Sequence, residues 1–348
     1  MKLGIIGLAG AGKTTVFEAL SRNIQDDSHK KESRIGMVQV PDSRVDILSG
    51  MYKPKKTIFA QVEYFLPGLR KRDKERDKKS GKEQDQWVKV RDCDALIHVV
   101  KNYKTYGLDK PDPYKNILAL DQELILADLI VVEKRLERMR LDKQRNRNID
   151  PEELALLEKC LVMLENETPV RRNIELAFAQ PLRGYAFLSA KPVLVLFNND
   201  DENDLLPEMG GNKINDTIMI IRGKLEQELV QMSEKDAADF LSEFNISVSA
   251  MNRVIEKSYK LLGLISFFTV GEDEVRAWTI KRSTAAVDAA EVIHSDIKKG
   301  FIRAEVLAYD DLIDAGTYQE ARKKGTVRLE GKTYQIKDGD IINFRFNV

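Results

Sequence analysis

The residue pattern with the clearest chemistry is GLAGAGKTT (7–15), which has the spacing G-x-x-x-x-G-K-[ST] between an apolar run and a helix-forming stretch. In such a loop, backbone N–H groups surround a phosphate, the lysine contacts the β- and γ-phosphate oxygens, and the first threonine hydroxyl coordinates Mg²⁺. The pattern predicts a nucleoside triphosphate site, and the alternative is a glycine-rich turn that binds nothing. The predicted binding residues are Gly7, Ala9, Gly10, Ala11, Gly12, Lys13, Thr14 and Thr15, with Thr14 as the metal ligand.

A second polar group follows a later apolar run, KPVLVLFN (191–198), where Asn198 and Asp201 form the pattern N-x-x-D. A carboxylate there can accept hydrogen bonds from the N1–H and 2-amino groups of guanine, and it disfavours a base that lacks these donors. The overlapping frame from Asn199 to Glu202 leaves the register open. A polar turn at a strand end is the other interpretation. We therefore expect ATP or GTP and leave the choice open.

The composition restricts the class of protein. The 348 residues include 56 basic and 56 acidic side chains, so the net charge is zero and bulk attraction to a polyanion is not expected. The two cysteines, Cys93 and Cys160, are too few and too far apart for a disulfide framework or a metal motif. No apolar run approaches the roughly 18 residues that cross a membrane. We expect a cytoplasmic protein of two or three domains, with no membrane partner and no sequence-specific DNA binding.

The elements that must position the phosphate loop alternate between strands and helices. Short apolar runs, bounded by turn residues and separated by helical segments, predict a mostly parallel sheet that is covered on both faces. The fold class is therefore α/β. The expected strands are 2–6, 34–40, 58–65, 94–100, 191–198 and 217–222.

Two long helical segments interrupt this pattern. The first runs from Asn116 to about Asn148, and the second from Pro151 to about Glu167. Asp150 is the expected N-cap of the second helix, with Pro151 at its first position. Two helices joined by a short loop predict an antiparallel helical arm.

The pattern changes again after Val270. A strand, a helix and further short strands follow, with a turn at 337–340 before the last strand. This order in fewer than 90 residues predicts a small α+β domain of the β-grasp type.

These stretches together resemble the YchF subfamily of P-loop NTPases, which belongs to the translation-factor class and is related to the Obg family. The resemblance covers nearly the whole chain. It implies a nucleotide-binding domain at 1–265, interrupted by a coiled-coil arm at 114–188, and a ubiquitin-like TGS domain at 266–348. It also implies slow hydrolysis of ATP or GTP with Mg²⁺, and association with ribosomes. The stretches that carry it are VQVPDSRVDIL (38–48), KPKK (53–56), DALIHVV (94–100), ELILADLIVVEKRLE (123–137), KPVLVLFN (191–198), LLGLISFFTVGEDEVRAWTI (261–280), HSDIKKGFIRAEVLAYDD (294–311) and DGDIINFRFNV (338–348).

The chain departs from this family in the residues that surround the γ-phosphate. Members carry Asp-x-x-Gly after the third strand, where the aspartate supports Mg²⁺ through water and the glycine N–H meets the γ-phosphate. Here Gly68 is kept but Phe65 stands at the aspartate position, and restoring an aspartate is expected to raise hydrolysis. No threonine lies between Thr15 and Thr57 to act in switch I, and Ser28 replaces it only if the loop shifts register. The family element that contacts the base from the last strand aligns with Arg222, Gly223 and Lys224.

Two basic segments are candidates for contact with RNA. Residues 70–82 contain eight basic and three acidic side chains, and the end of the arm, 134–148, contains seven basic and two acidic ones. Contact with RNA phosphates is one interpretation, and a solvated surface of mixed charge is the other. With the resemblance, these segments and the TGS domain predict a ribosome or RNA partner.

Two functions follow from these observations. The first is an NTPase switch that controls engagement with ribosomes in translation or a stress response. The second is a scaffold that binds the nucleotide without hydrolysing it and recruits RNA or protein. The missing carboxylate and switch threonine favour nucleotide binding with weak or lost hydrolysis, and no catalytic residue is assigned.

Overall fold

The computed structural model describes residues 1–22, 32–68, 84–105, 107, 110–211, 213–243 and 249–347. These residues form two compact units, of which the first comprises 1–37 and 63–254 and the second 38–62 and 255–348. The units differ from the predicted domain boundaries at 265 and 266 in two ways. Residues 38–62 group with the C-terminal part of the chain, and that part begins at residue 255.

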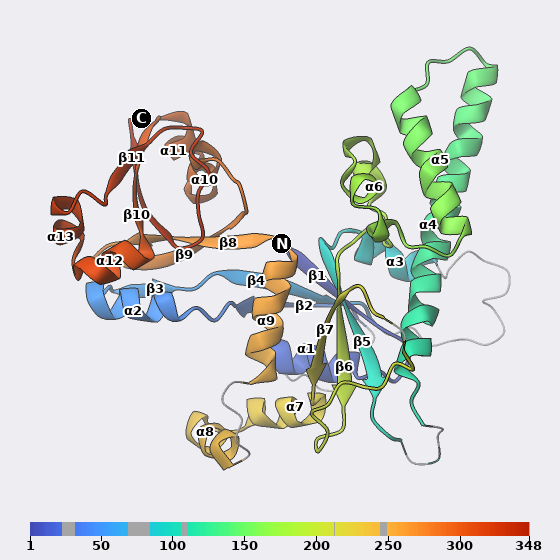
Figure 1. Cartoon of the computed structure of the whole chain (residues 1–348), viewed down its shortest axis with the longest axis horizontal. Coiled ribbons are helices and arrows are strands. Elements are labelled where there is room, and N and C mark those ends of the chain that lie inside the picture. The colour runs from blue at the N-terminus through green and yellow to red at the C-terminus, as the bar shows by residue number, and fades with distance from the viewer. Residues whose placement is uncertain are drawn as a thin grey trace. The chain divides into compact units, whose positions relative to one another are not determined.

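The first unit is built on a six-stranded sheet in the order β2-β4-β1-β5-β6-β7 (Figure 1). The pairs β1–β4, β1–β5, β5–β6 and β6–β7 are parallel, which confirms the predicted fold class. Strand β6 is buried along its whole length, as a strand covered on both faces should be. The strands are β1 (Lys2–Ile6), β2 (Arg34–Gln39), β4 (Gln61–Leu66), β5 (Ala95–Asn102), β6 (Val193–Asn199) and β7 (Thr217–Ile221).

Helices of the first unit cover this sheet and extend from it. A core cluster joins Phe65, Leu96 and Phe197 of the sheet to Val90 of α3 and Leu120 of α4. Helix α1 packs against α7, and Gln227 of α7 donates to Glu18 of α1 at 2.6 Å. The helices are α1 (Lys13–Ser21), α3 (Gln84–Arg91), α4 (Pro113–Gln144), α7 (Gly223–Gln231) and α8 (Glu234–Glu243), and α9 (Ala250–Leu261) begins in the first unit and continues into the second at residue 255.

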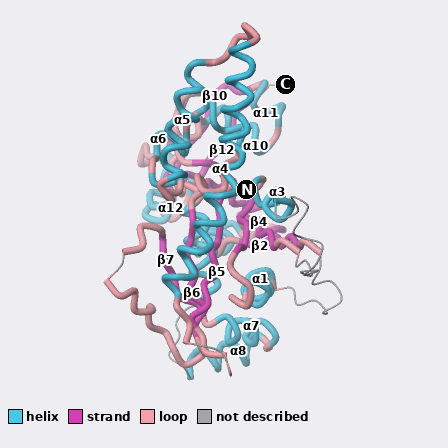
Figure 2. The backbone as a smooth tube through the Cα atoms, turned by 90° about the vertical axis from the view of Figure 1, so that its right-hand side faces the viewer, coloured by secondary structure: helices cyan, strands magenta, loops and turns pink. Residues whose placement is uncertain are grey.

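The arm consists of α4 and the antiparallel helix α5 (Pro151–Glu165), which lie side by side in both ribbon views (Figures 1 and 2). Asp150 caps α5 by accepting from the backbone N–H groups of Glu152 and Glu153, and Pro151 occupies the first turn, as predicted. A second core cluster fills the space between the arm helices and the segment that returns to the sheet. That segment contains η3 (Val170–Arg172), α6 (Ile174–Phe178) and η4 (Gln180–Tyr185).

Two buried ion-pair clusters hold the base of the arm. Arg91 of α3 lies 2.8 Å from Asp128 of α4, whose fully buried carboxylate also accepts from the N–H groups of Leu188 and Ser189. Arg171 lies 2.7 Å from Asp121 and 3.1 Å from Asp216. Removing one partner of such a buried pair costs about 3–5 kcal/mol, because it leaves the other charge unpaired.

The second unit contains a six-stranded sheet in the order β11-β10-β12-β8-β9-β3. Helix α10 packs on this sheet through an apolar cluster that includes Phe267, Phe301 and Phe344. The strands are β3 (Lys56–Ile58), β8 (Leu264–Val270), β9 (Glu274–Lys281), β10 (Phe301–Ala308), β11 (Arg328–Glu330) and β12 (Asp340–Phe346). The helices are α2 (Ser43–Tyr52), α10 (Ala286–Ile293), α11 (Ser295–Lys299), α12 (Tyr309–Ala315) and α13 (Tyr318–Lys323).

Candidate phosphate-binding site

The loop between β1 and α1 has a backbone that requires its glycines. Gly10 and Gly12 have φ values of +75° and +91°, in the region that other residues rarely adopt. A Cβ at Gly7 would collide with the carbonyl oxygen of Val99, and one at Gly12 with the amide nitrogen of Asn198. The loop therefore has close neighbours at Gly7 and Gly12, and it leads into the N-terminus of α1, where a helix favours an anion.

Lys13 is held in place by the loop itself. Its ammonium donates to the carbonyls of Gly7 at 2.7 Å and Leu8 at 2.9 Å. An ammonium group has three N–H donors, so these two contacts leave one for a phosphate oxygen. Burial lowers the pKa of Lys13, while Glu123 opposes that shift. Thr14 and Thr15 follow in the first turn of α1, both partly exposed.

Asn198 joins the loop to two other predicted segments. Its side chain is buried, donates to the carbonyl of Ala11 at 3.1 Å and accepts from the N–H of Gly223 at 3.0 Å. A Cβ at Gly223 would lie only 2.7 Å from the Asn198 side-chain oxygen, so the turn can approach this closely only as glycine. The structure thus brings the loop, the end of β6 and the 222–224 turn together.

The frame of the N-x-x-D pattern is visible in these contacts. Asn198 contacts the loop, whereas Asn199 accepts from Asn102 at 2.8 Å and donates to the carbonyls of Asn203 and Leu205. Asp201 accepts from the N–H of Leu225 at 3.2 Å in the first turn of α7. The frame that begins at Asn198 therefore faces the loop, and Asp201 lies at a helix N-terminus.

Among the described residues, the backbone of Gly223 bonds to Asn198, whereas the side chains of Arg222 and Lys224 contact other groups. Arg222 donates to the carbonyl of Asp201 at 3.3 Å and so closes the turn. Lys224 has a side chain that is 74% exposed and lies 3.9 Å from Glu228. Its side chain belongs to the surface, and only its backbone is near the site.

Tyr103 is a residue of this site that no sequence motif marks. Its hydroxyl donates to the carbonyl of Gly10 at 2.5 Å, and the ammonium of Lys101 lies 5.0 Å from its ring centroid. The next residue, Lys104, donates its N–H to Asp200 at 3.2 Å. The usable signal is topological, because Tyr103 follows the carboxyl end of β5, next to β1, where open α/β sheets bind ligands.

The end of β4 is apolar, in contrast to the phosphate loop. Phe65 is 3% exposed and lies in the core cluster with Ile6, and the ammonium of Lys2 is 4.5 Å from its ring centroid. The N–H of Gly68 reaches the hydroxyl of Ser33 at 3.4 Å, a partner that the sequence does not suggest. Position 65 therefore serves the core instead of the phosphate site.

Two predicted features fall outside the described residues. These are Ser28 of switch I and the basic segment 70–82. Over the part of the chain that the structure describes, no group of three or more His, Cys, Asp or Glu side chains could hold a metal ion. A metal at this site would need Thr14 together with phosphate oxygens. Over the same residues, no helix is long and apolar enough to span a membrane.

A family model and several known proteins are similar to this chain in sequence. The YchF-GTPase_C family model, described as a protein of unknown function (DUF933), matches residues 264–347. The ribosome-binding ATPase YchF of Bacillus subtilis is 36% identical, with 99% of this chain and 99% of that protein covered. The ribosome-binding ATPase YchF of Haemophilus influenzae is 35% identical, with 100% and 99% covered.

Two solved structures are similar to this chain in fold. The Schizosaccharomyces pombe YchF GTPase is similar, with a TM-score of 0.84 at 30% identity over 99% of this chain and 97% of that one. A GTP binding protein from Pyrococcus horikoshii has a TM-score of 0.58 at 17% identity over the whole of both chains, a likeness of fold alone.

Proposed function

The chain belongs to the YchF family, and we propose that it binds a purine nucleoside triphosphate with Mg²⁺ and associates with ribosomes, with slow or lost hydrolysis. The single observation that carries the nucleotide claim is the hydrogen-bonded loop, in which Lys13 binds two loop carbonyls and Asn198 binds a third. A loop already ordered in this way loses little conformational freedom when it binds a phosphate chain.

The residues present fit a nucleotide and its metal. Gly10 and Gly12 have the backbone conformations of a phosphate loop, and α1 begins at its end. The Thr14 hydroxyl would coordinate Mg²⁺, and the ion would neutralise charge on the β- and γ-phosphates. Asp201 would face the base. The curated relatives are named ATPases and the Schizosaccharomyces pombe protein a GTPase, so ATP and GTP are both candidates.

Weak hydrolysis is supported by the end of β4. Phosphoryl transfer depends mainly on positioning and on stabilising charge in the transition state. Phe65 offers neither, because its side chain is buried in the core. Losing one preorganised polar group typically costs about 2.7–4 kcal/mol, or roughly 10²- to 10³-fold in rate. The same observation favours a nucleotide-bound scaffold as the second candidate function.

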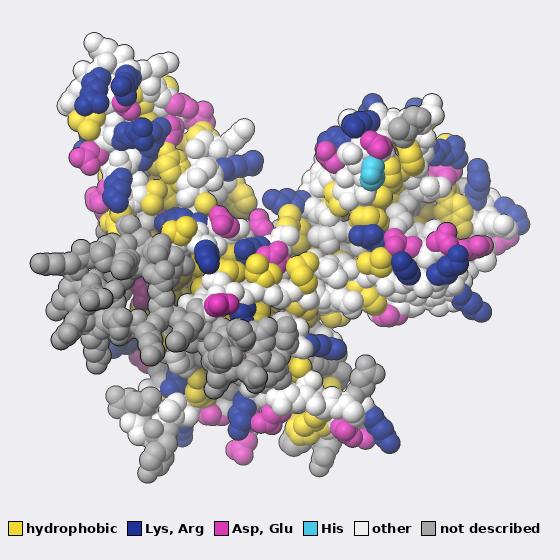
Figure 3. Space-filling view, turned by 180° about the vertical axis from the view of Figure 1, so that it is seen from behind, with side chains coloured by type: hydrophobic (Ala, Val, Ile, Leu, Met, Phe, Trp, Pro, Cys, Tyr) yellow, Lys and Arg dark blue, Asp and Glu magenta, His cyan; other side chains and the backbone are white. Residues whose placement is uncertain are grey.

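The arm is the element best suited to RNA among the described residues. Its end, residues 134–148, presents basic side chains that are exposed, and Lys and Arg gather there in the space-filling view (Figure 3). Such side chains can neutralise RNA phosphates and release counterions. The exposed basic residues are Lys134, Arg138, Arg140, Lys143, Arg145 and Arg147.

A nucleotide titration tests the proposal. Fluorescent ATP and GTP analogues are titrated with Mg²⁺ into the unmodified chain and into Lys13→Ala. We expect binding to the unmodified chain and about 10- to 100-fold weaker binding to the variant, because a charge-assisted hydrogen bond contributes about 1.5–3 kcal/mol and Lys13 has one N–H left for a phosphate oxygen.

Lys224→Ala is the matched control, since its side chain is exposed and pairs with Glu228 at the surface. It should bind within about twofold of the unmodified chain. Equal affinity of Lys13→Ala and the unmodified chain would contradict the assigned site.

A further inference from the structure

Residues 38–62, here called the handle, connect two strands of the first sheet but fold with the second unit. The handle begins within β2 and ends within β4, which are neighbours in the first sheet. At its base the N–H of Val40 donates to the carbonyl of Ala60 at 2.8 Å. The two ends of the handle are therefore tied together, and whatever moves β2 and β4 also moves the handle.

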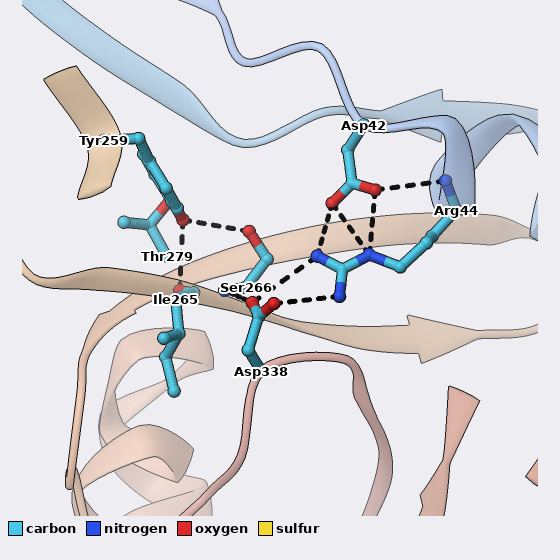
Figure 4. Close-up of polar contacts among 7 residues, drawn as sticks. All are labelled: Asp42, Arg44, Tyr259, Ile265, Ser266, Thr279 and Asp338. Carbon is cyan, nitrogen blue, oxygen red and sulfur yellow. Dashed lines mark hydrogen bonds and ion pairs between the residues drawn. The ribbon is translucent and has the colours of Figure 1, made fainter. Parts of the chain in front are cut away.

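Arg44 fastens the handle to the sheet of the second unit (Figure 4). Its guanidinium pairs with Asp42 of the handle at 2.8 Å and with Asp338 at 3.0 Å. It also lies over the ring of Phe268, at 5.1 Å from the centroid. Asp338 in turn accepts from the N–H of Ser266 at 2.9 Å. Arg44 thus connects α2 of the handle to β8 and to the turn before β12.

The Arg44 guanidinium is held by two carboxylates and not by one. Its side chain is 26% exposed, that of Asp42 within the handle 13%, and that of Asp338 46%. Burial alone would lower the pKa of Arg44, but the hydrogen bonds to Asp42 and Asp338 raise it. The guanidinium is held on several sides, so it has little freedom to leave.

A tyrosine hydroxyl reaches the same strand from another side. Tyr259 of α9 donates to the carbonyl of Ile265 at 3.0 Å and lies 2.9 Å from the Ser266 hydroxyl (Figure 4). Ser266 therefore receives contacts from α9 and, through Asp338, from the handle. The handle and α9 are the segments with which the two parts of the second unit, 38–62 and 255–348, begin.

The ends of β2 and β4 that lie away from the handle are the start of β2 and the end of β4. Ser33 stands just before β2 and Gly68 just after β4, and the Gly68 N–H reaches the Ser33 hydroxyl at 3.4 Å. Strand β4 also pairs with β1, which leads directly into the phosphate loop. A change in the phosphate loop when a nucleotide binds can therefore reach β4, and with it the root of the handle, through β1.

We propose that the handle couples nucleotide binding in the first unit to the second unit, with Arg44 as the residue that makes the handle part of the second unit. This inference rests on the proposed function, because it requires a nucleotide at the phosphate loop. It adds that the C-terminal sheet responds to that nucleotide through the chain between β2 and β4.

Hydrogen exchange of the full chain tests the coupling. Exchange is measured with and without saturating nucleotide and Mg²⁺, at residues 43–52 of α2 and 264–270 of β8. In the unmodified chain we expect nucleotide to change the exchange of both segments by about fivefold or more, the lower end of typical coupling. In Arg44→Gln we expect nucleotide affinity within about twofold of the unmodified chain and no response in β8.

Two further variants make the test specific. Asp338→Asn keeps an acceptor for Ser266 but loses the ion pair, so it should also lose the response. Lys55→Gln is the matched control, because Lys55 and Asp273 join the handle to the second unit with side chains that are 78% and 85% exposed. Such a pair contributes little, so this variant should respond like the unmodified chain.

The outcomes separate the two claims. Nucleotide binding without any change in β8 of the unmodified chain would overturn the coupling and leave the proposed function intact. A full response in both Arg44→Gln and Asp338→Asn would overturn the role of Arg44. No nucleotide binding in the unmodified chain would overturn the proposed function, and the coupling with it.

Discussion

The phosphate loop and the end of β4 lie at the carboxyl ends of neighbouring strands, yet they are equipped differently. In the loop, Lys13 and Asn198 are polar, partly or fully buried, and hydrogen-bonded to backbone carbonyls. At the end of β4, Phe65 is buried among apolar side chains. We propose that binding a triphosphate uses the first set of contacts, and that rapid hydrolysis would also need a polar group from the second. Holding and cleaving a nucleotide would then depend on different regions of the first unit.

The largest expected effect comes from placing a carboxylate at the end of β4. Phe65→Asp removes a buried ring and places a carboxylate among apolar side chains, with only the ammonium of Lys2 close by, so the free energy of unfolding should fall by about 3–5 kcal/mol. Urea denaturation followed by circular dichroism measures this loss. A single-turnover assay on the same variant tests the expectation from sequence that aspartate here raises hydrolysis.

Phe65→Leu serves as the control for that substitution. It keeps the position apolar and should cost only about 1–2 kcal/mol. If Phe65→Asp were as stable as Phe65→Leu and hydrolysed nucleotide faster than the unmodified chain, the contrast between the two regions would disappear.

The next effect concerns the connection between the loop and β6. Asn198→Ala leaves the carbonyl of Ala11 and the N–H of Gly223 without their partner, at about 1–3 kcal/mol for each unsatisfied group. Nucleotide affinity should fall by about tenfold to 100-fold, measured by the same fluorescence titration.

Asn203→Ala tests whether that loss is specific. Its side chain accepts from Leu205 within the same loop and does not contact the phosphate loop in the described structure. It should bind nucleotide within about threefold of the unmodified chain. An equal loss in both variants would indicate a general effect on the loop.

A smaller effect on nucleotide affinity is expected from the residue that we propose faces the purine base. Asp201→Asn keeps an acceptor for Leu225 but replaces a charged acceptor with an amide. GTP affinity should fall by about tenfold while ATP affinity changes by less than about threefold, if the carboxylate accepts from guanine. Competition titrations with unlabelled nucleotides give both values. Equal changes for ATP and GTP would show that Asp201 acts on α7 and does not distinguish the bases.

The smallest effect concerns the arm. Replacing Arg138, Arg140 and Lys143 with Gln should reduce the slope of log affinity for ribosomes against log salt by about 2, because each phosphate contact contributes about 0.7–0.9. Nucleotide affinity should not change. The measurement is a sedimentation assay over a series of salt concentrations, and an unchanged slope would assign these side chains to a solvated surface.

Local patterns predicted the parts of this molecule that are set by short-range physics. The glycines of the loop, the cap at Asp150 with Pro151, and the alternation of buried strands and helices each follow from a few adjacent residues. The Asn198 frame was open in the sequence because Asn199 and Glu202 satisfy the same spacing. Only the contacts of Asn198 with Ala11 and Gly223 distinguish the two frames.

Features that depend on distant parts of the chain were not predictable in this way. Tyr103 reaches Gly10 only because β5 lies beside β1. The handle joins the second unit through Arg44 and Asp338, which are 294 positions apart in sequence. An alignment by motif put Phe65 at a metal-supporting position, but its packing against Ile6 and Leu96 is a property of the folded core.

The most direct test of the central claim is a single-turnover hydrolysis assay on the unmodified chain, with nucleotide and Mg²⁺ bound at saturation. Binding is first established by titration, so that an absence of product cannot reflect an empty site. We expect tight binding with hydrolysis barely above the uncatalysed rate. Rapid Mg²⁺-dependent turnover would contradict this expectation and would show that another group supplies what Phe65 does not.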